Sequence, residues 1–157
     1  MGAYAKSLDE VMDLARKSAE VTHNHPEGVK GAQATALAIH LAFTGKNKDE
    51  IKNMIENTFA YDLHRKYDDI QPLYRFEVSC QESVPQSIIA FLESDDYESA
   101  IRKAVAFGGD ADTMGAITGG IAAAFYGEIP SHILNECLNR LPDEMKKVIN
   151  KFNAIIN

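Results

Sequence analysis

The residues best suited to chemistry follow a pair of glycines, Gly108 and Gly109. Asp110, Asp112 and Thr113 come directly after this pair. Carboxylate and hydroxyl oxygens are hard ligands, and the D-x-D-T spacing can direct three of them at one Mg²⁺, Mn²⁺ or Ca²⁺ ion. The alternative is structural, because an aspartate after a glycine stop is a common helix cap that needs no metal. An EF-hand is not indicated, since no glutamate occupies the twelfth position of the loop.

A second candidate is the segment 22–26, which contains His23 and His25 and ends at Pro26. Imidazoles and backbone amides at a helix N-terminus can bind phosphate without a basic patch. Two histidines at this spacing could instead be zinc ligands, but no cysteine or third histidine has suitable local spacing. A third interpretation is that these side chains only shape the turn before the proline.

A third candidate is the segment 74–81, in which aromatic residues precede Cys80. Aromatic side chains on a loop can stack on a nucleobase, although under a long loop they more often belong to a satellite core. Cys80 could act as a nucleophile only beside a base. With Cys137 it completes the cysteine content, which indicates two free thiols in a reducing cytoplasm.

Helical periodicity dominates the elements that must position these residues. The second expected helix is apolar nearly all round, which predicts that it is central and buried. No segment alternates with period two, so we expect an all-α fold, a compact multi-helix orthogonal bundle forming a single domain over 1–157. No assignment is made for 60–81. The expected helices span about 8–19, 29–44, 48–59, 83–93, 96–105, 113–126, 130–141 and 142–156.

The helix expected over 113–126 contains Gly115, Gly119 and Gly120. Each glycine costs about 1 kcal/mol relative to alanine inside a helix, so some compensation is needed. Gly115 and Gly119 are four residues apart and share a face. That face would allow another backbone or a ligand to approach closely.

The composition excludes several classes of partner. Asp and Glu number 23 against 16 Lys and Arg, which gives a net charge of -7. Such a charge repels a phosphate backbone and argues against general nucleic-acid binding. An anionic ligand would therefore need a local device, such as a helix N-terminus or a metal ion. No signal pattern and no apolar run near the ~20 residues of a membrane span occurs, so we expect a cytoplasmic protein with no membrane segment.

Four stretches together resemble the ADP-ribosylglycohydrolase family, which includes dinitrogenase reductase-activating glycohydrolase. They are 18–28, 31–34, 78–85 and the glycine-aspartate motif 108–113. The resemblance implies a helical fold with two divalent ions, Mg²⁺ or Mn²⁺, that hold the ADP-ribose diol and position water at the anomeric carbon. By the same motif Asp110, Asp112 and Thr113 would be metal ligands, the two aspartates also being catalytic. His23, Gly108 and Gly109 would lie against the ADP-ribose.

The match departs from the family in ways that affect activity. It covers only the C-terminal half, and the N-terminal segments that carry a glutamate ligand and a Thr-Asp-Asp run are absent. Glu82 stands where bacterial members tend to have glycine, and Ala111 where serine or threonine is usual. We therefore expect a weak or incomplete metal site in this chain, because Mg²⁺ needs octahedral completion.

Two functions follow from these departures. The first is metal-dependent hydrolysis of ADP-ribose from a modified target when an N-terminal half complements the chain. The second is a non-catalytic truncated module that binds a nucleotide or a protein partner. A homodimer would bury any apolar face left exposed. The linkage cleaved, whether to arginine, serine, an acetyl group or a nucleic acid, stays open.

Overall fold

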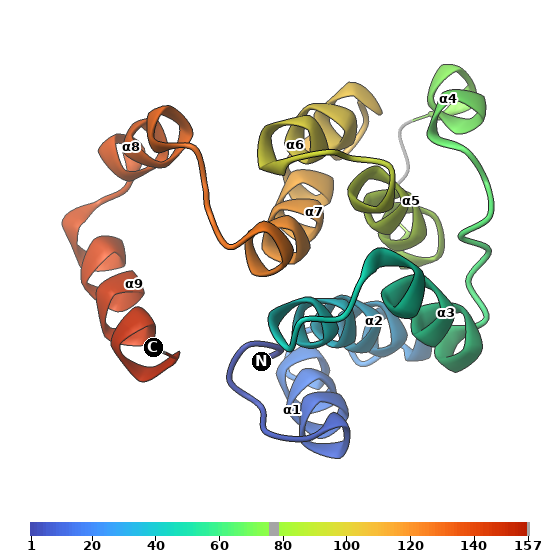
Figure 1. Ribbon diagram of the computed structural model, residues 1–157. Coiled ribbons are helices and arrows are strands. Elements are labelled where there is room, and N and C mark those ends of the chain that lie inside the picture. The colour runs from blue at the N-terminus through green and yellow to red at the C-terminus, as the bar shows by residue number, and fades with distance from the viewer. Residues whose placement is uncertain (76–78, 157) are drawn as a thin grey trace.

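The computed structural model describes residues 1–75 and 79–156, and these residues form helices and no strand. This confirms the all-α class and the multi-helix bundle (Figure 1). Phe76, Glu77 and Val78 of the predicted aromatic segment lie outside the described residues. In chain order the elements are α1 (Leu8–Glu20), α2 (Pro26–Phe43), α3 (Lys48–Phe59), α4 (Tyr67–Ile70), η1 (Gln71–Leu73), α5 (Cys80–Leu92), α6 (Tyr97–Ala106), α7 (Ala111–Tyr126), α8 (Ser131–Arg140) and α9 (Asp143–Ile156).

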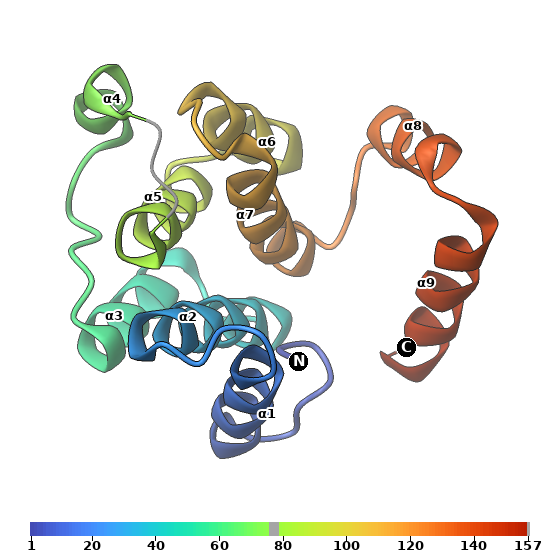
Figure 2. The same cartoon turned by 180° about the vertical axis from the view of Figure 1, so that it is seen from behind.

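Helix α2 is the centre of the bundle, as its all-round apolar sequence predicted. It packs against α1, α3, α5 and α7 (Figures 1 and 2). Its small side chains let these neighbours approach, and Ala34 and Ala38 have no exposed surface. The burial of apolar surface along α2 therefore organises most of the core.

Helix α7 approaches α2, α5 and α6 through small residues. The Thr118 hydroxyl donates to the buried carbonyl of Ser87 in α5 at 2.8 Å. A Cβ atom added at Gly119 would lie 3.0 Å from the Ile101 side chain, and one at Gly120 would lie 3.2 Å from Ile39. Nothing lies within 4 Å of the corresponding position at Gly115. Gly119 thus permits close packing as expected, whereas Gly115 has no such neighbour and Gly120 takes that role.

Two helices that carry candidate residues begin earlier than predicted. α7 begins at Ala111 with Asp110 as its N-cap residue, so Asp112 lies in the first turn rather than at the cap. Gly108 and Gly109 adopt left-handed backbone angles, φ 77° and 61°, which reverse the chain before Asp110. α2 begins at Pro26 rather than at 29 because proline is favoured at the first helical position.

The unassigned segment 60–81 holds the short helix α4, the turn η1 and the start of α5. α5 begins at Cys80, before the predicted Ser83, so Pro85 lies inside the helix and not in its first turn. Having no N–H, Pro85 leaves the carbonyl of Gln81 without its helical donor. α3 begins with a capping box, in which Asn47 accepts from the N–H of Glu50 and the Glu50 carboxylate accepts from the N–H of Asn47.

Helices α8 and α9 lie at the edge of the bundle, and α8 contacts α6 through His132 and Glu98 at 3.4 Å (Figures 1 and 2). None of the residues 127–155 is buried. One side of α9 is apolar and lies in solvent, and it includes Met145, Val148, Ile149 and Phe152. Within the described residues, no helix has the length and apolar character that crossing a membrane requires.

Lys48, the first residue of α3, contacts the C-terminal ends of α5 and α7. Its ammonium donates to the carbonyl of Ser94, which follows α5, and to the hydroxyl of Tyr126 at the end of α7 at 3.0 Å. The same nitrogen lies 5.1 Å from the ring centroid of Phe91 and 5.7 Å from that of Phe125. A cation at the C-terminal end of a helix also complements the helix dipole.

Replacing Lys48 by methionine tests this contact. Lys48→Met keeps the apolar stem but removes the ammonium, so the free energy of unfolding should fall by about 1–3 kcal/mol. Lys46→Met is the matched control, since Lys46 pairs with Glu50 on an exposed surface. The control should change stability by less than about 0.5 kcal/mol. Equal effects in urea denaturation would show that Lys48 is only a surface charge.

The exposed side of α9 is the face that the expected homodimer would bury. Light scattering over a range of concentrations should then give a mass rising toward twice that of one chain. Phe152→Asp should hold the protein as a monomer. Phe43→Asp is the control, because Phe43 is 47% exposed against 42% for Phe152 but lies on α2. A concentration-independent monomeric mass for the unmodified chain rules the dimer out.

Candidate functional site

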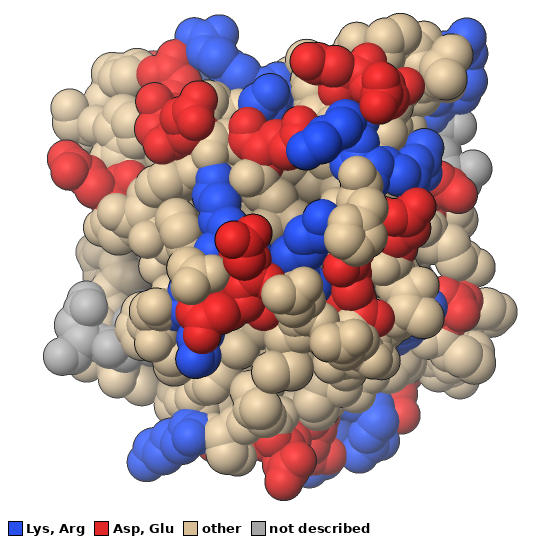
Figure 3. Space-filling view, turned by 45° about the vertical axis from the view of Figure 1, so that its right-hand side comes forward, with Lys and Arg blue, Asp and Glu red and all other residues tan. Residues whose placement is uncertain are grey.

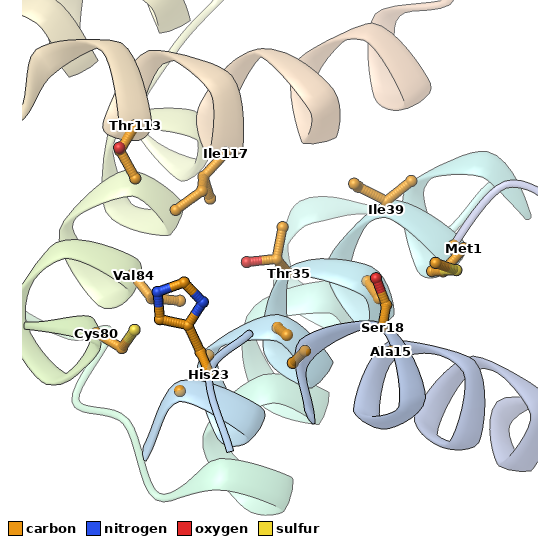
Figure 4. Close-up of a pocket in the computed structure, with 16 residues that line it drawn as sticks. Met1, Ala15, Ser18, His23, Thr35, Ile39, Cys80, Val84, Thr113 and Ile117 are labelled. Carbon is orange, nitrogen blue, oxygen red and sulfur yellow. The ribbon is translucent and has the colours of Figure 1, made fainter. Parts of the chain in front are cut away.

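A cavity of about 580 Å³ opens between α1, α2, α5 and α7 (Figure 4). Most of its wall is apolar. In Figure 4 the ring of His23 and the thiol of Cys80 point into the same space, with Thr113 across it. The cavity is lined by Met1, Gly2, Ala15, Ser18, Ala19, His23, Gly28, Gly31, Ala32, Thr35, Ala36, Ile39, Cys80, Val84, Thr113 and Ile117.

Three helix N-termini meet at this cavity. Gly28 is the third residue of α2, Cys80 the first of α5 and Thr113 the third of α7, and all three line the wall. A helix N-terminus carries partial positive charge and unpaired N–H groups, so three of them favour an anionic ligand. On the face seen in Figure 3, acidic and basic side chains are interspersed, so that face shows no comparable region of one sign.

The two aspartates of the glycine-aspartate motif are brought into contact. A hydrogen bond with the Asp110 carboxyl lowers the pKa of Asp112, and backbone N–H groups of Asp112 and Thr113 lower it further. Two carboxyl groups this close need a proton or a cation between them. The backbone contacts also mean that Asp112 helps to cap α7, so its side chain has a structural partner as well as Asp110.

Some of the predicted site residues line the cavity and others do not. His23 and Thr113 line it, whereas Asp110, Asp112, Gly108 and Gly109 do not. In the part of the chain that the structure describes, no group of three or more His, Cys, Asp and Glu side chains is arranged to hold a metal. An ion held by the two aspartates would therefore need further oxygen donors.

The two histidines before α2 have different surroundings. The ring of His23 contacts the Thr22 hydroxyl at 2.8 Å and faces the cavity. His25 is the N-cap of α2, and its Nδ1 accepts the backbone N–H of Glu27 at 3.3 Å. His25 thus shapes the turn before Pro26, which was one of the alternatives that the sequence left open.

Sequence reasoning missed the polar wall residues Ser18 and Thr35. Thr35 had a signal, since it interrupts an otherwise apolar helix. Ser18 begins the stretch 18–28 that carries the family resemblance, but its place on the wall depends on how α1 packs on α2. Cys80 was singled out only as a nucleophile that would need a base, and the structure places it on the same wall as His23.

Comparisons with family models, with curated proteins and with solved structures indicate the same family. The family model described as ADP-ribosylglycohydrolase matches residues 1–156. Human ADP-ribosylhydrolase ARH3 is 28% identical, the match covering 86% of this chain and 50% of that protein. The ADP-ribosyl-[dinitrogen reductase] glycohydrolase of Rhodospirillum rubrum is 26% identical, with 87% of this chain and 47% of that protein covered.

An uncharacterised protein of Archaeoglobus fulgidus is 30% identical over 87% of this chain and 50% of its own length. A solved structure titled ADP-ribosylglycohydrolase-related protein complex superposes with a TM-score of 0.65 at 28% identity, covering 83% of this chain and 48% of that one. The chain thus spans about half the length of the curated relatives it matches.

The contact between the two aspartates predicts how Asp112 titrates. Asp110→Ala removes the first cause of its lowered pKa, so the pKa of Asp112 should rise toward its ordinary value. Asp110→Asn keeps a hydrogen-bond donor and should leave the pKa of Asp112 low. Carbon NMR titration of the carboxyl groups measures both. The same Asp112 pKa in both variants would mean that the two side chains do not interact.

Proposed function

Because the chain belongs to the ADP-ribosylglycohydrolase family, we propose that it takes part in metal-dependent removal of ADP-ribose from a modified target. The observation that carries this proposal is the meeting of three helix N-termini at one cavity, with Thr113 on its wall and an aspartate pair beside Thr113. ADP-ribose combines a diphosphate with sugar hydroxyls. The diphosphate favours helix N-termini, which carry partial positive charge, and the sugar hydroxyls favour a hard cation.

In this proposal the diphosphate lies at the N-termini of α2, α5 and α7. Their N–H groups and dipoles supply the positive field that the net charge of -7 does not. His23 lies on the same wall and contacts the ligand from the turn before α2. Gly108 and Gly109 lie outside the wall of the cavity, and their left-handed backbone turns the chain into α7 so that the aspartates and Thr113 follow at its N-terminus.

Asp110, Asp112 and Thr113 are the oxygen donors for Mg²⁺ or Mn²⁺. Carboxylate and hydroxyl oxygens suit such an ion, and the contact between the two carboxyl groups brings two of the three donors together. A bound ion would orient the ribose diol and lower the pKa of an attacking water. In this proposal a complementing N-terminal half supplies the remaining ligands.

The alternative function is a binding module without catalysis. It is favoured by the same shortage of donors, since two carboxylates and one hydroxyl do not complete an octahedral site. The cavity would then bind a nucleotide or another anionic partner through the helix N-termini alone. A chain of this kind would bind ADP-ribose with no dependence on a metal.

A hydrolysis assay with arginine-linked and serine-linked ADP-ribosyl peptides tests the proposal. The protein should release ADP-ribose in Mg²⁺ or Mn²⁺ when the missing ligands are supplied, and a chelator should stop the release. Asp112→Asn should lower the rate about 100-fold while its amide oxygen still caps α7. Asp143→Asn, a first-turn aspartate of α9, is the matched control and should leave the rate unchanged.

Two results would contradict hydrolysis. In the first, the chelator has no effect or the Asp112→Asn variant is as fast as the control. In the second, the complemented protein binds ADP-ribose without releasing it from either peptide, which would select the binding module.

A further inference from the structure

A second cavity, of about 260 Å³, lies on the other side of α5 from the first. At 3.6 residues per turn, Cys80 and Val84 share the face toward the first cavity, while Glu82 and Gln86 share the opposite face. The second cavity is closed by the start of α2 and by the connection after α3. It is lined by Glu27, Lys30, Ala60, Tyr61, Asp62, Arg65, Gln81, Glu82, Pro85 and Gln86.

Gln86 presents a buried oxygen that has no hydrogen-bond donor. The residue is 1% exposed, and its Oε1 has no partner. Its Nε2 donates to the Glu82 carboxylate at 3.0 Å. Turning the amide over would place Oε1 against that carboxylate, so the contact with Glu82 fixes the orientation. Buried polar atoms without partners are rare, and each calls for an explanation such as a bound molecule.

Tyr61 adds a second unsatisfied group to the same wall. It is 8% exposed, and its hydroxyl has no hydrogen-bond partner. Burial, followed by electrostatic repulsion from Glu27 and Cys80, raises the pKa of Tyr61 to about 12. The group is therefore a neutral hydroxyl, able to donate. Lys30 covers its ring, with the ammonium 4.6 Å from the centroid.

The charged residues of this wall are of both signs and are poorly paired. Arg65 and Glu82 are both exposed. Across the described ranges 1–75 and 79–156, Arg65 makes no ion pair, and the Glu82 carboxylate accepts from Gln86. Lys30 and Glu27 are 3.8 Å apart, a long contact for an ion pair. A neighbouring cavity of about 280 Å³ shares Arg65, Glu82 and Gln86 and adds the apolar side chains of Ile70 and Leu73.

We propose that this cavity binds a small zwitterion of the α-amino acid class. Its ammonium would donate to Gln86 Oε1 beside the Glu82 carboxylate. Its carboxylate would accept from the Tyr61 hydroxyl and pair with Arg65, and its side chain would extend toward Ile70 and Leu73. A zwitterion of this class would satisfy both the buried acceptor Gln86 Oε1 and the buried donor of Tyr61, and would place its opposite charges beside the exposed Glu82 and Arg65. The site is separate from the cavity assigned to ADP-ribose.

Thermal unfolding of the full chain, run with each standard L-amino acid in millimolar excess, tests the site. At least one amino acid should raise Tm by several degrees. Its N-acetyl derivative and its methyl ester, which each lack one charge, should not. Arg65→Gln and Gln86→Met should lose the shift, and Arg102→Gln, an exposed arginine of α6, should keep it.

Gln86→Met has a further readout that a merely structural role would not give. Because it removes a buried oxygen with no donor, the ligand-free variant should have an unchanged or higher Tm while failing to respond to the amino acid. Should that variant not fold, the exposed Arg65→Gln decides. The proposal is overturned if no amino acid shifts Tm, if the shift survives in Arg65→Gln, or if the acetylated or esterified form binds equally well. None of these results depends on ADP-ribose hydrolysis.

Discussion

The close packing of small residues around α2 is the constraint on which the site depends. Gly31 lies where an added Cβ would be 3.1 Å from Val84 and 3.2 Å from Cys80, so α5 sits directly against α2. Gly120 gives α7 the same access to Ile39. Interiors pack at nearly crystalline density, so larger residues here would push the helices apart. Because α5 and α7 both pack closely on α2, the N-termini of all three helices can line one cavity.

Much of the fold was predictable from local sequence, and the helix boundaries that were predicted wrongly have local causes. The apolar character of α2 and the helical periodicity over 48–59 identified elements that the structure confirms. The starts of α2 and α7 were placed late, since the proline preference at Pro26 and the left-handed Gly109 act on a single turn that periodicity does not resolve. The segment 60–81 has no long periodic run, so α4 lacks a pattern to find.

The candidate site was predictable to the extent that its residues are neighbours in sequence. Asp110, Asp112 and Thr113 form one motif; the two aspartates are in contact, and their role as metal ligands with Thr113 stays a prediction. His23 and Thr113 are far apart in the sequence, so their common wall could come only from family resemblance or from the structure. Gln86 and Tyr61 illustrate the limit, because an unpaired atom is defined by what surrounds it in space.

The end of α7 separates the bundle from α8 and α9. Tyr126 is held by Lys48 and Ser94, and the very next residue, Gly127, reverses the backbone at φ 72°. A force on α8 or α9 therefore reaches the bundle through Tyr126 and through the contact of His132 in α8 with Glu98 in α6 at 3.4 Å. A reporter protein attached after α9 would be joined to a part of the chain in which no residue from 127 to 155 is buried.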